Sequence, residues 1–146
     1  MKVSQAMSSE VVSVSMDDSL KEAVCQMVMH NIGMVTVTDA DENLIGVVTV
    51  RDVMLPLYPD AGEYVHDTLH ARDFEAMEEN YDRVLKIKVG DVMTANPVTV
   101  SSDDSVLKAA SFMGLKNLRR IPVVDDGKQM GILSIENINN ALFLNR

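Results

Sequence analysis

The sequence contains one segment twice, and this repeat constrains the fold more than any other feature. Residues 3–39 align without gaps with residues 89–125, and 13 of these 37 pairs are identical. Unrelated segments of that length would share about two or three identities. After a one-residue deletion the register resumes at Ile45 and Met130. The copies therefore predict one fold made twice, and they lie too far apart for a solenoid array.

Each copy has the pattern of a β-α-β-β-α unit. Alternating valines predict a brief strand at the end of Met7–Val14 and of Met93–Val100. Short polar residues at 17–19 and 103–105 are typical of helix starts, because their side chains accept hydrogen bonds from unpaired amides. A second helix is expected to open at Thr49 and at Ser134. The other predicted elements are helices Leu20–His30 and Val106–Lys116, each ended by an asparagine, and strands Met34–Thr38, Leu44–Val48, Ile121–Val124 and Met130–Leu133.

One copy of about 55 residues would bury too little surface to be stable alone. We therefore expect an α/β (α+β) fold in which two copies pack sheet against sheet with pseudo-twofold symmetry. Such packing creates two equivalent clefts, which are natural ligand sites. The predicted regions are repeat 1 over 1–54, an acidic and partly helical insert over 55–88, and repeat 2 with a tail over 89–146. Pro56 and Pro59 interrupt helix in the insert, which would cap the module or pair with a second chain.

Charge and hydropathy exclude several functions. The net charge of −9 argues against a nucleic-acid surface, which needs clustered lysine and arginine. No apolar run approaches the roughly 20 residues of a membrane span, and no signal peptide is evident, so a cytoplasmic location is expected. Cys25 is the only cysteine, which excludes an intrachain disulfide, and its apolar context predicts a small buried side chain.

Repeat 1 carries the motif Ile45-Gly46-Val47-Val48-Thr49-Val50-Arg51-Asp52. Taken alone, the motif favours a structural interpretation. Thr49 and Asp52 have the spacing of a helix capping box, in which each side chain binds the other residue's amide. Gly46 would then let two backbones approach closely.

The motif does not stand alone, and with the repeat it resembles the cystathionine-β-synthase (CBS) domain pair, or Bateman module. The resemblance covers Val3–Met54 and Val89–Ile138, and it includes Met93–Val100 and the strand Ile121–Asp125. It implies a stand-alone, non-catalytic regulatory module that binds AMP, ADP or ATP, whereas some members bind S-adenosylmethionine. It also implies a homodimer and an effector protein in trans that responds to the ligand. No catalytic cofactor is implied.

The family's binding residues carry over onto two unequal sites. In the family, the aspartate of Thr/Ser-x-x-Asp binds ribose hydroxyls and the threonine or serine contacts phosphate, and each site also takes residues from the other copy. An ionised carboxylate suits a ribose, because it accepts two hydroxyl hydrogen bonds. The first site would comprise Thr49, Asp52, Thr94, Asn96, Pro97, Val98, Thr99, Arg119, Arg120, Ile121 and Pro122, with the arginines on phosphate. The second would comprise Ser8, Val11, Val12, Ser13, Met34, Val35, Ser134 and Asn137.

The second site departs from the family pattern. Asn137 replaces the ribose-binding aspartate, Gly33 and Met34 replace the arginine pair, and Glu10 would repel a phosphate. We therefore expect the first site to bind an anionic nucleotide. The second site is expected to be weak, empty or selective for a less anionic adenosine compound.

Two alternatives remain at the level of sequence. The chain could be a structural or interaction module without a ligand, with the acidic insert as its binding surface. His66 and His70 are spaced to share a helical face, which could hold a metal ion, but a solvated acidic helix is favoured and no metal site is predicted. No Gly-rich phosphate loop or nucleophile elbow is present, so no catalytic residue is predicted.

Overall fold

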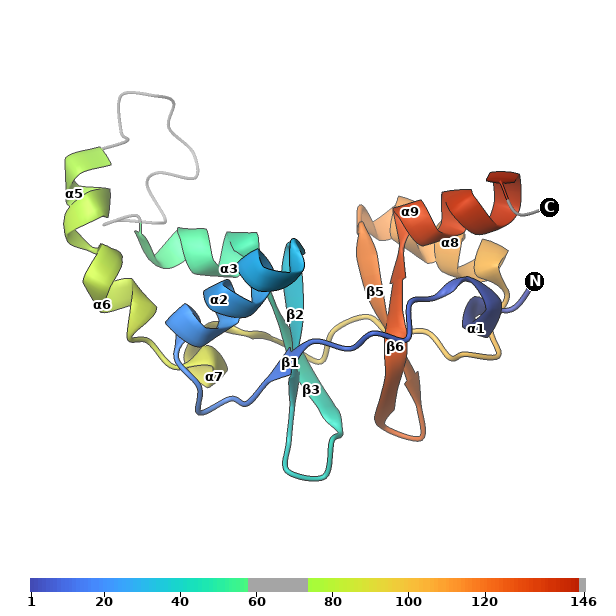
Figure 1. Cartoon of the computed structure of the whole chain (residues 1–146), viewed down its shortest axis with the longest axis horizontal. Helices are drawn as coiled ribbons and strands as arrows, with labels where there is room; N and C mark the ends of the chain where they lie inside the picture. Colours follow the sequence, from blue (N-terminus) through green and yellow to red (C-terminus); the bar gives the residue numbers. More distant parts are fainter. Residues whose placement is uncertain (58–73, 145–146) are drawn as a thin grey trace. The chain divides into compact units, whose positions relative to one another are not determined.

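A computed structural model of the chain describes residues 1–57 and 74–144 (Figure 1). The chain divides into two compact units. Unit 1 comprises Met1–Ser13, Thr38–Ile45 and Asn96–Arg146, and unit 2 comprises Val14–Val37 and Gly46–Ala95. Each unit therefore contains most of one repeat together with the N-terminal segment of the other. The prediction of two β-α-β-β-α repeats in an α+β fold is confirmed.

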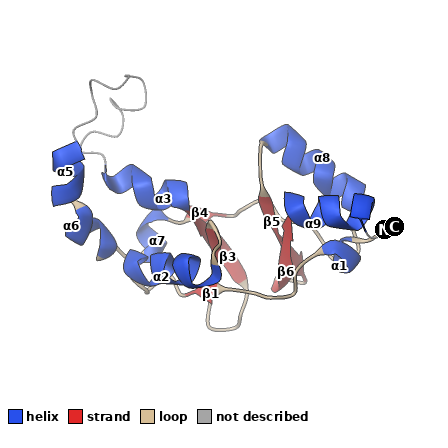
Figure 2. Ribbon diagram, turned by 45° about the horizontal axis from the view of Figure 1, so that its top comes forward, coloured by secondary structure: helices blue, strands red, loops and turns tan. Residues whose placement is uncertain are grey.

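Unit 2 is built on most of a four-stranded sheet with strand order β1-β2-β3-β4. Strand β4 comes from repeat 2, and it pairs antiparallel with β3 so that Gly46 lies opposite Ala95 and Val47 opposite Thr94. Helices α2 and α3 lie on one side of the sheet (Figure 2). The strands are β1 (Ser13–Val14), β2 (Met34–Thr38), β3 (Leu44–Thr49) and β4 (Thr94–Ala95). The helical elements are α2 (Leu20–His30), α3 (Val50–Met54), η1 (Leu55–Leu57), α5 (Phe74–Glu79), α6 (Tyr81–Leu85) and α7 (Val89–Val92).

Unit 1 repeats this plan around an antiparallel pair, β5 (Arg120–Asp125) and β6 (Lys128–Ser134). Val100 forms a parallel bridge to Val123 in β5, and Ser8 of repeat 1 forms an antiparallel bridge to Ile132 in β6. The Ser8 bridge corresponds to the β3–β4 pairing of unit 2. The helical elements are α1 (Val3–Ala6), α8 (Val106–Lys116), α9 (Ile135–Asn139) and the π-helical turn η3 (Asn140–Leu144).

The two long helices have the predicted bounds because local signals fix both ends. Ser19 and Ser105 are the N-cap residues, and their hydroxyls accept hydrogen bonds from the amides of Glu22 and Leu107. Asn31 and Asn117 end the helices in the left-handed conformation, with φ of 52° and 53°. Asparagine tolerates that conformation better than most residues.

Reciprocal main-chain hydrogen bonds hold the exchanged N-terminal segments. The amide of Val3 donates to the carbonyl of Asp104, and the amide of Val89 donates to the carbonyl of Asp18. Both bonds are 2.8 Å long, and each joins the start of one repeat to the turn before the long helix of the other. The resemblance implied that each motif faces the entry segment of the other copy, but these hydrogen bonds at the start of each repeat were not predicted.

Apolar side chains from both repeats fill the two cores. In unit 2 the insert contributes Val84 of α6, which is buried, so this part of the insert packs on repeat 1. The prediction that Cys25 is buried is wrong. Ala23 and Met27 occupy the inner face of α2, and two residues beyond Ala23 a helix has turned by about 200°, which exposes Cys25. The core of unit 1 contains Val3, Val100, Val106, Ala109, Met113, Ile121, Val123, Leu133 and Ile138.

Two strand predictions needed adjustment. The strands of repeat 2 are longer than expected, because the pairing of β5 with β6 continues to Arg120 and Ser134 at one end. In the segment 93–100 the strand lies at Thr94–Ala95 rather than at the alternating valines. There Val100 makes a single bridge, to Val123, and the next amide, that of Ser101, donates to the Asp104 carboxylate at 2.9 Å.

No helix in the described ranges, 1–57 and 74–144, is long and apolar enough to cross a membrane.

Candidate functional site

Gly46 and Gly131 bring each strand of the motif against the N-terminal segment of the other repeat. A Cβ atom added to Gly46 would lie 2.8 Å from the Met93 sulfur and 3.0 Å from the Thr94 carbonyl oxygen. One added to Gly131 would lie 2.4 Å from the Ser8 carbonyl oxygen. The interpretation of Gly46 as a point of close backbone approach is confirmed, and Gly131 has the same part in unit 1.

The capping box predicted for Thr49 and Asp52 is present. The Thr49 amide donates to Asp52 Oδ2 at 2.9 Å, and the Asp52 amide donates to Thr49 Oγ1 at 3.4 Å. The Thr49 hydroxyl also lies 3.2 Å from Oδ2. Capping therefore uses one carboxylate oxygen, and Oδ1 is left for another partner.

That partner is Thr94, which β4 places beside the motif. Its hydroxyl lies 3.3 Å from Asp52 Oδ1 and 3.4 Å from Oδ2. Asp52 is half-buried and Thr94 is exposed, so this cluster is open to solvent on the Thr94 side. Unit 2 thus brings together Thr49, Asp52 and Thr94, three of the residues predicted for the first site.

The other residues predicted for the first site belong to unit 1. Asn96 has a left-handed backbone with φ of 51° and follows β4 directly. Ile121 and Pro122 are buried in β5, so their side chains belong to the core of that unit. The combination of these residues with Asp52 in one cleft stays a prediction. The residues concerned are Asn96, Pro97, Val98, Thr99, Arg119, Arg120, Ile121 and Pro122.

The arginine pair lies at the start of α9, next to the second copy of the motif. The Ile135 amide donates to the Arg119 carbonyl at 3.1 Å, and Arg119 Nη2 lies 3.8 Å from Glu136 Oε1. The Arg119 side chain is 74% exposed, so this ion pair is weak. The pKa of Glu136 is lowered, chiefly by a hydrogen bond from its own backbone, then by the Ser134 hydroxyl and by Arg120 and Arg119. Glu136 therefore carries its negative charge beside both arginines, and the weak ion pair leaves the Arg119 side chain exposed to solvent.

The Ser134–Asn137 box of unit 1 matches the Thr49–Asp52 box without its charge. The Ser134 amide donates to Asn137 Oδ1 and the Asn137 amide donates to Ser134 Oγ, both at 3.0 Å. The Ser8 hydroxyl, which corresponds to that of Thr94, accepts from the Glu10 amide at 3.3 Å. Among the described residues, no hydrogen bond joins Ser8 to Asn137. Asparagine thus performs the capping function but leaves no carboxylate.

The remaining residues of the predicted second site are divided between the units. Val11, Val12 and Ser13 lie in unit 1, whereas Met34 and Val35 lie in β2 of unit 2. Val35 is buried, and its side chain belongs to the core. The second site as a whole stays a prediction.

The alternative metal site at His66 and His70 lies outside the described residues. Within the described ranges, no group of three or more histidine, cysteine, aspartate or glutamate residues could hold a metal ion.

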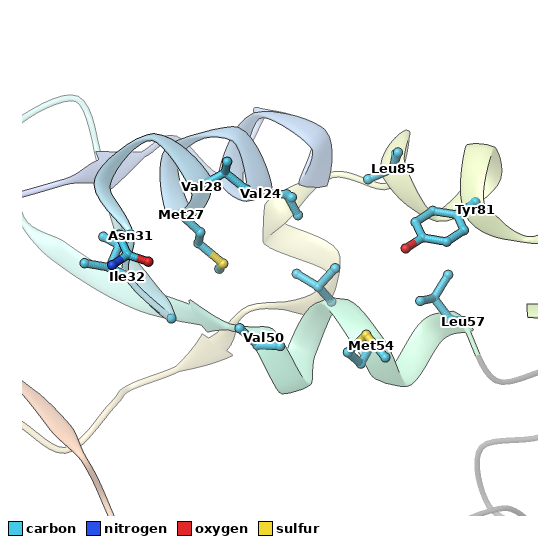
Figure 3. Close-up of a pocket in the computed structure, with 12 residues that line it drawn as sticks. Val24, Met27, Val28, Asn31, Ile32, Val50, Met54, Leu57, Tyr81 and Leu85 are labelled. Carbon is cyan, nitrogen blue, oxygen red and sulfur yellow. The ribbon is translucent and has the colours of Figure 1, made fainter. Parts of the chain in front are cut away.

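Unit 2 also contains an apolar pocket of about 550 Å³, which the sequence did not predict (Figure 3). Helices α2, α3 and α6 line it with side chains that include Val24, Val28, Met54, Tyr81 and Leu85. Val24 and Val28 on α2 are four residues apart, as are Tyr81 and Leu85 on α6. This spacing is the signal in the sequence that would have indicated an apolar face on each helix.

Comparison with known proteins gives consistent matches over the whole chain. The CBS domain matches residues 3–58 and 89–144. The uncharacterized protein YlbB of Bacillus subtilis is 30% identical over 94% of this chain and 80% of its own length. The CBS domain of a membrane protein from Sphaerobacter thermophilus has a TM-score of 0.74 and 30% identity, covering 99% of this chain and 89% of that one. The CBSX2 protein, solved in complex with AMP, has a TM-score of 0.74 and 27% identity, covering 99% and 98%. CBSX2 is a protein of Arabidopsis thaliana.

Proposed function

The chain belongs to the CBS domain family, and from that premise we propose that it is a non-catalytic regulatory module that binds an adenine nucleotide, AMP, ADP or ATP. The observation that carries this proposal is the carboxylate of Asp52, which is held by its own helix and still has an acceptor oxygen outside the capping box. The proposal makes Asp52 the ribose ligand. It also makes this site the stronger of the two.

The chemistry of the named groups supports a nucleotide. Hydrogen bonds to a charged acceptor contribute about 1.5–3 kcal/mol each, so a ribose that binds Asp52 through two hydroxyls gains specificity as well as affinity. Phosphate would bind the guanidinium groups of Arg119 and Arg120, because the single proton of the Thr49 hydroxyl is already directed to Asp52 at 3.2 Å. A local basic pair matters in this chain, because its net charge of −9 repels anions elsewhere. The AMP complex of CBSX2, a protein similar over nearly the whole chain, adds support.

A thermal melt with a panel of nucleotides tests this proposal. Ligand at 100 times its Kd stabilises the folded state by about 2.7 kcal/mol, which should raise Tm by roughly 5–10 °C. We expect AMP, ADP or ATP to raise Tm, and GMP to serve as the control that does not. S-adenosylmethionine is the alternative adenosine ligand to include. No shift with any adenosine compound at millimolar concentration would favour a module that binds proteins through its acidic insert.

We further propose that the chain forms a homodimer and that an effector protein responds to the nucleotide in trans. Large apolar side chains are exposed on each unit, with Val28 at 75% in unit 2 and Leu115 and Phe143 at 86% and 74% in unit 1. The apolar pocket beside α2 adds to the apolar surface of unit 2. Sedimentation velocity should give twice the chain mass of 16.1 kDa. A species of 16.1 kDa at micromolar concentration would contradict the homodimer.

A further inference from the structure

The Asp52 carboxylate has too few acceptor positions for its present donors and a ribose together. A carboxylate offers about four lone-pair positions. Three donors already use it: the Thr49 amide at 2.9 Å, the Thr49 hydroxyl at 3.2 Å and the Thr94 hydroxyl at 3.3 Å. The 2′ and 3′ hydroxyls of a ribose would add two more donors to these three, which is one more than the roughly four positions can accept. One donor must therefore leave when a ribose binds.

Thr94 is the donor that leaves most easily. The two Thr49 donors belong to the capping box, in which Thr49 Oγ1 also accepts from the Asp52 amide, so losing them would disturb the start of α3. The Thr94 hydroxyl comes from a different strand, and it is shared between Oδ1 and Oδ2 at 3.3 and 3.4 Å. Thr94 is exposed, so its hydroxyl can bind water instead.

The corresponding position of the other repeat lacks this arrangement. Ser8 Oγ is engaged by the Glu10 amide, and within the described part of the chain it makes no hydrogen bond to Asn137. Asn137 uses Oδ1 for its capping box. Among the described residues, the motif therefore bonds to the hydroxyl of the other repeat's N-terminal segment at Asp52 and not at Asn137.

We propose that the Thr94 hydroxyl competes with the ribose of a nucleotide for Asp52, and so lowers affinity and sets how strongly the site selects ribose over deoxyribose. This inference rests on the proposed function, because it takes Asp52 as the ribose ligand. Thr94 is thus part of the site as a displaceable partner of Asp52. Valine, which has the same shape without the hydroxyl, removes the competitor.

Calorimetric titration of the full chain with AMP tests this inference. Thr94→Val should bind AMP about threefold to tenfold more tightly than the wild type, since one hydrogen bond no longer has to be broken. With 2′-deoxy-AMP, which brings one ribose hydroxyl, the donors total about four and Thr94→Val should give no gain. Thr94→Ser restores the hydroxyl and should restore wild-type affinity. Thr38→Val, a strand threonine outside the site, is the matched control, and a melt of each variant confirms folding.

The outcomes separate this inference from the proposed function. If the wild type binds AMP and Thr94→Val binds it equally or more weakly, the competition is refuted and the proposed function stands. An equal gain with AMP and 2′-deoxy-AMP also refutes the competition. If the wild type binds no adenine nucleotide, the proposed function fails and the competition fails with it.

Discussion

Asp52→Asn is expected to weaken AMP binding by about 30- to 150-fold and to leave Tm nearly unchanged. The repeat supplies the reason, because Asn137 closes the same capping box with its amide oxygen at 3.0 Å. Asparagine at position 52 should therefore keep the helix start and remove only the charge. Two hydroxyl bonds to a neutral instead of a charged acceptor lose roughly 1–1.5 kcal/mol each, which gives this factor. Titration calorimetry with a parallel thermal melt measures both effects.

Asn137→Ala is the matched control for Asp52→Asn. It removes the amide of the second motif, and we expect AMP affinity at the stronger site to remain within about twofold of wild type. Loss of AMP binding in Asn137→Ala with full binding in Asp52→Asn would contradict the assignment of the stronger site. It would then favour a site in which the neighbouring Arg119 and Arg120 of unit 1 compensate for the missing carboxylate.

Gly131→Ala is expected to lower the free energy of unfolding by about 2–4 kcal/mol. The added Cβ would lie 2.4 Å from the Ser8 carbonyl oxygen, a contact with backbone that a rotamer change cannot relieve. The amide of Ile132 donates to that same carbonyl at 2.9 Å, so the bridge between Ser8 and Ile132 would have to open. Urea denaturation followed by circular dichroism measures the loss.

Gly114→Ala is the control for an added methyl group. Gly114 lies in α8, and no atom lies within 4 Å of the added Cβ, so alanine should stabilise the helix by roughly 0.5–1 kcal/mol. Equal stability of Gly131→Ala and wild type would show that Ser8 does not approach β6 closely. The exchange of N-terminal segments described above would then be incorrect.

The long helices and the hairpin strands were predictable because their signals are local. Apolar spacing, a serine N-cap and an asparagine C-cap lie within or beside each helix, and the bounds of α2 and α8 agree with the sequence prediction. The capping box at Thr49 was predictable for the same reason. The four-residue helices α1 and α7 were not, since so short a segment shows no apolar period.

The exchange of N-terminal segments could not be predicted from local pattern. It depends on hydrogen bonds between residues far apart in sequence, such as Val3 with Asp104, which leave no mark in composition. The local indication was a glycine inside each motif strand, at 46 and 131, where glycine weakens a strand unless another backbone approaches. The resemblance to CBS pairs assigned Thr94 and Asp52 to one site, but the hydrogen bond between them is seen only in the structure.

The proposed function requires one strong adenine-nucleotide site per chain, built on Asp52. Titration calorimetry of the wild-type chain with AMP, ADP and ATP measures it most directly, because it gives affinity and stoichiometry together. One equivalent of the preferred nucleotide should bind per chain, and that binding should be weaker in Asp52→Asn. Two equivalents of equal affinity, or full binding in Asp52→Asn, would contradict it.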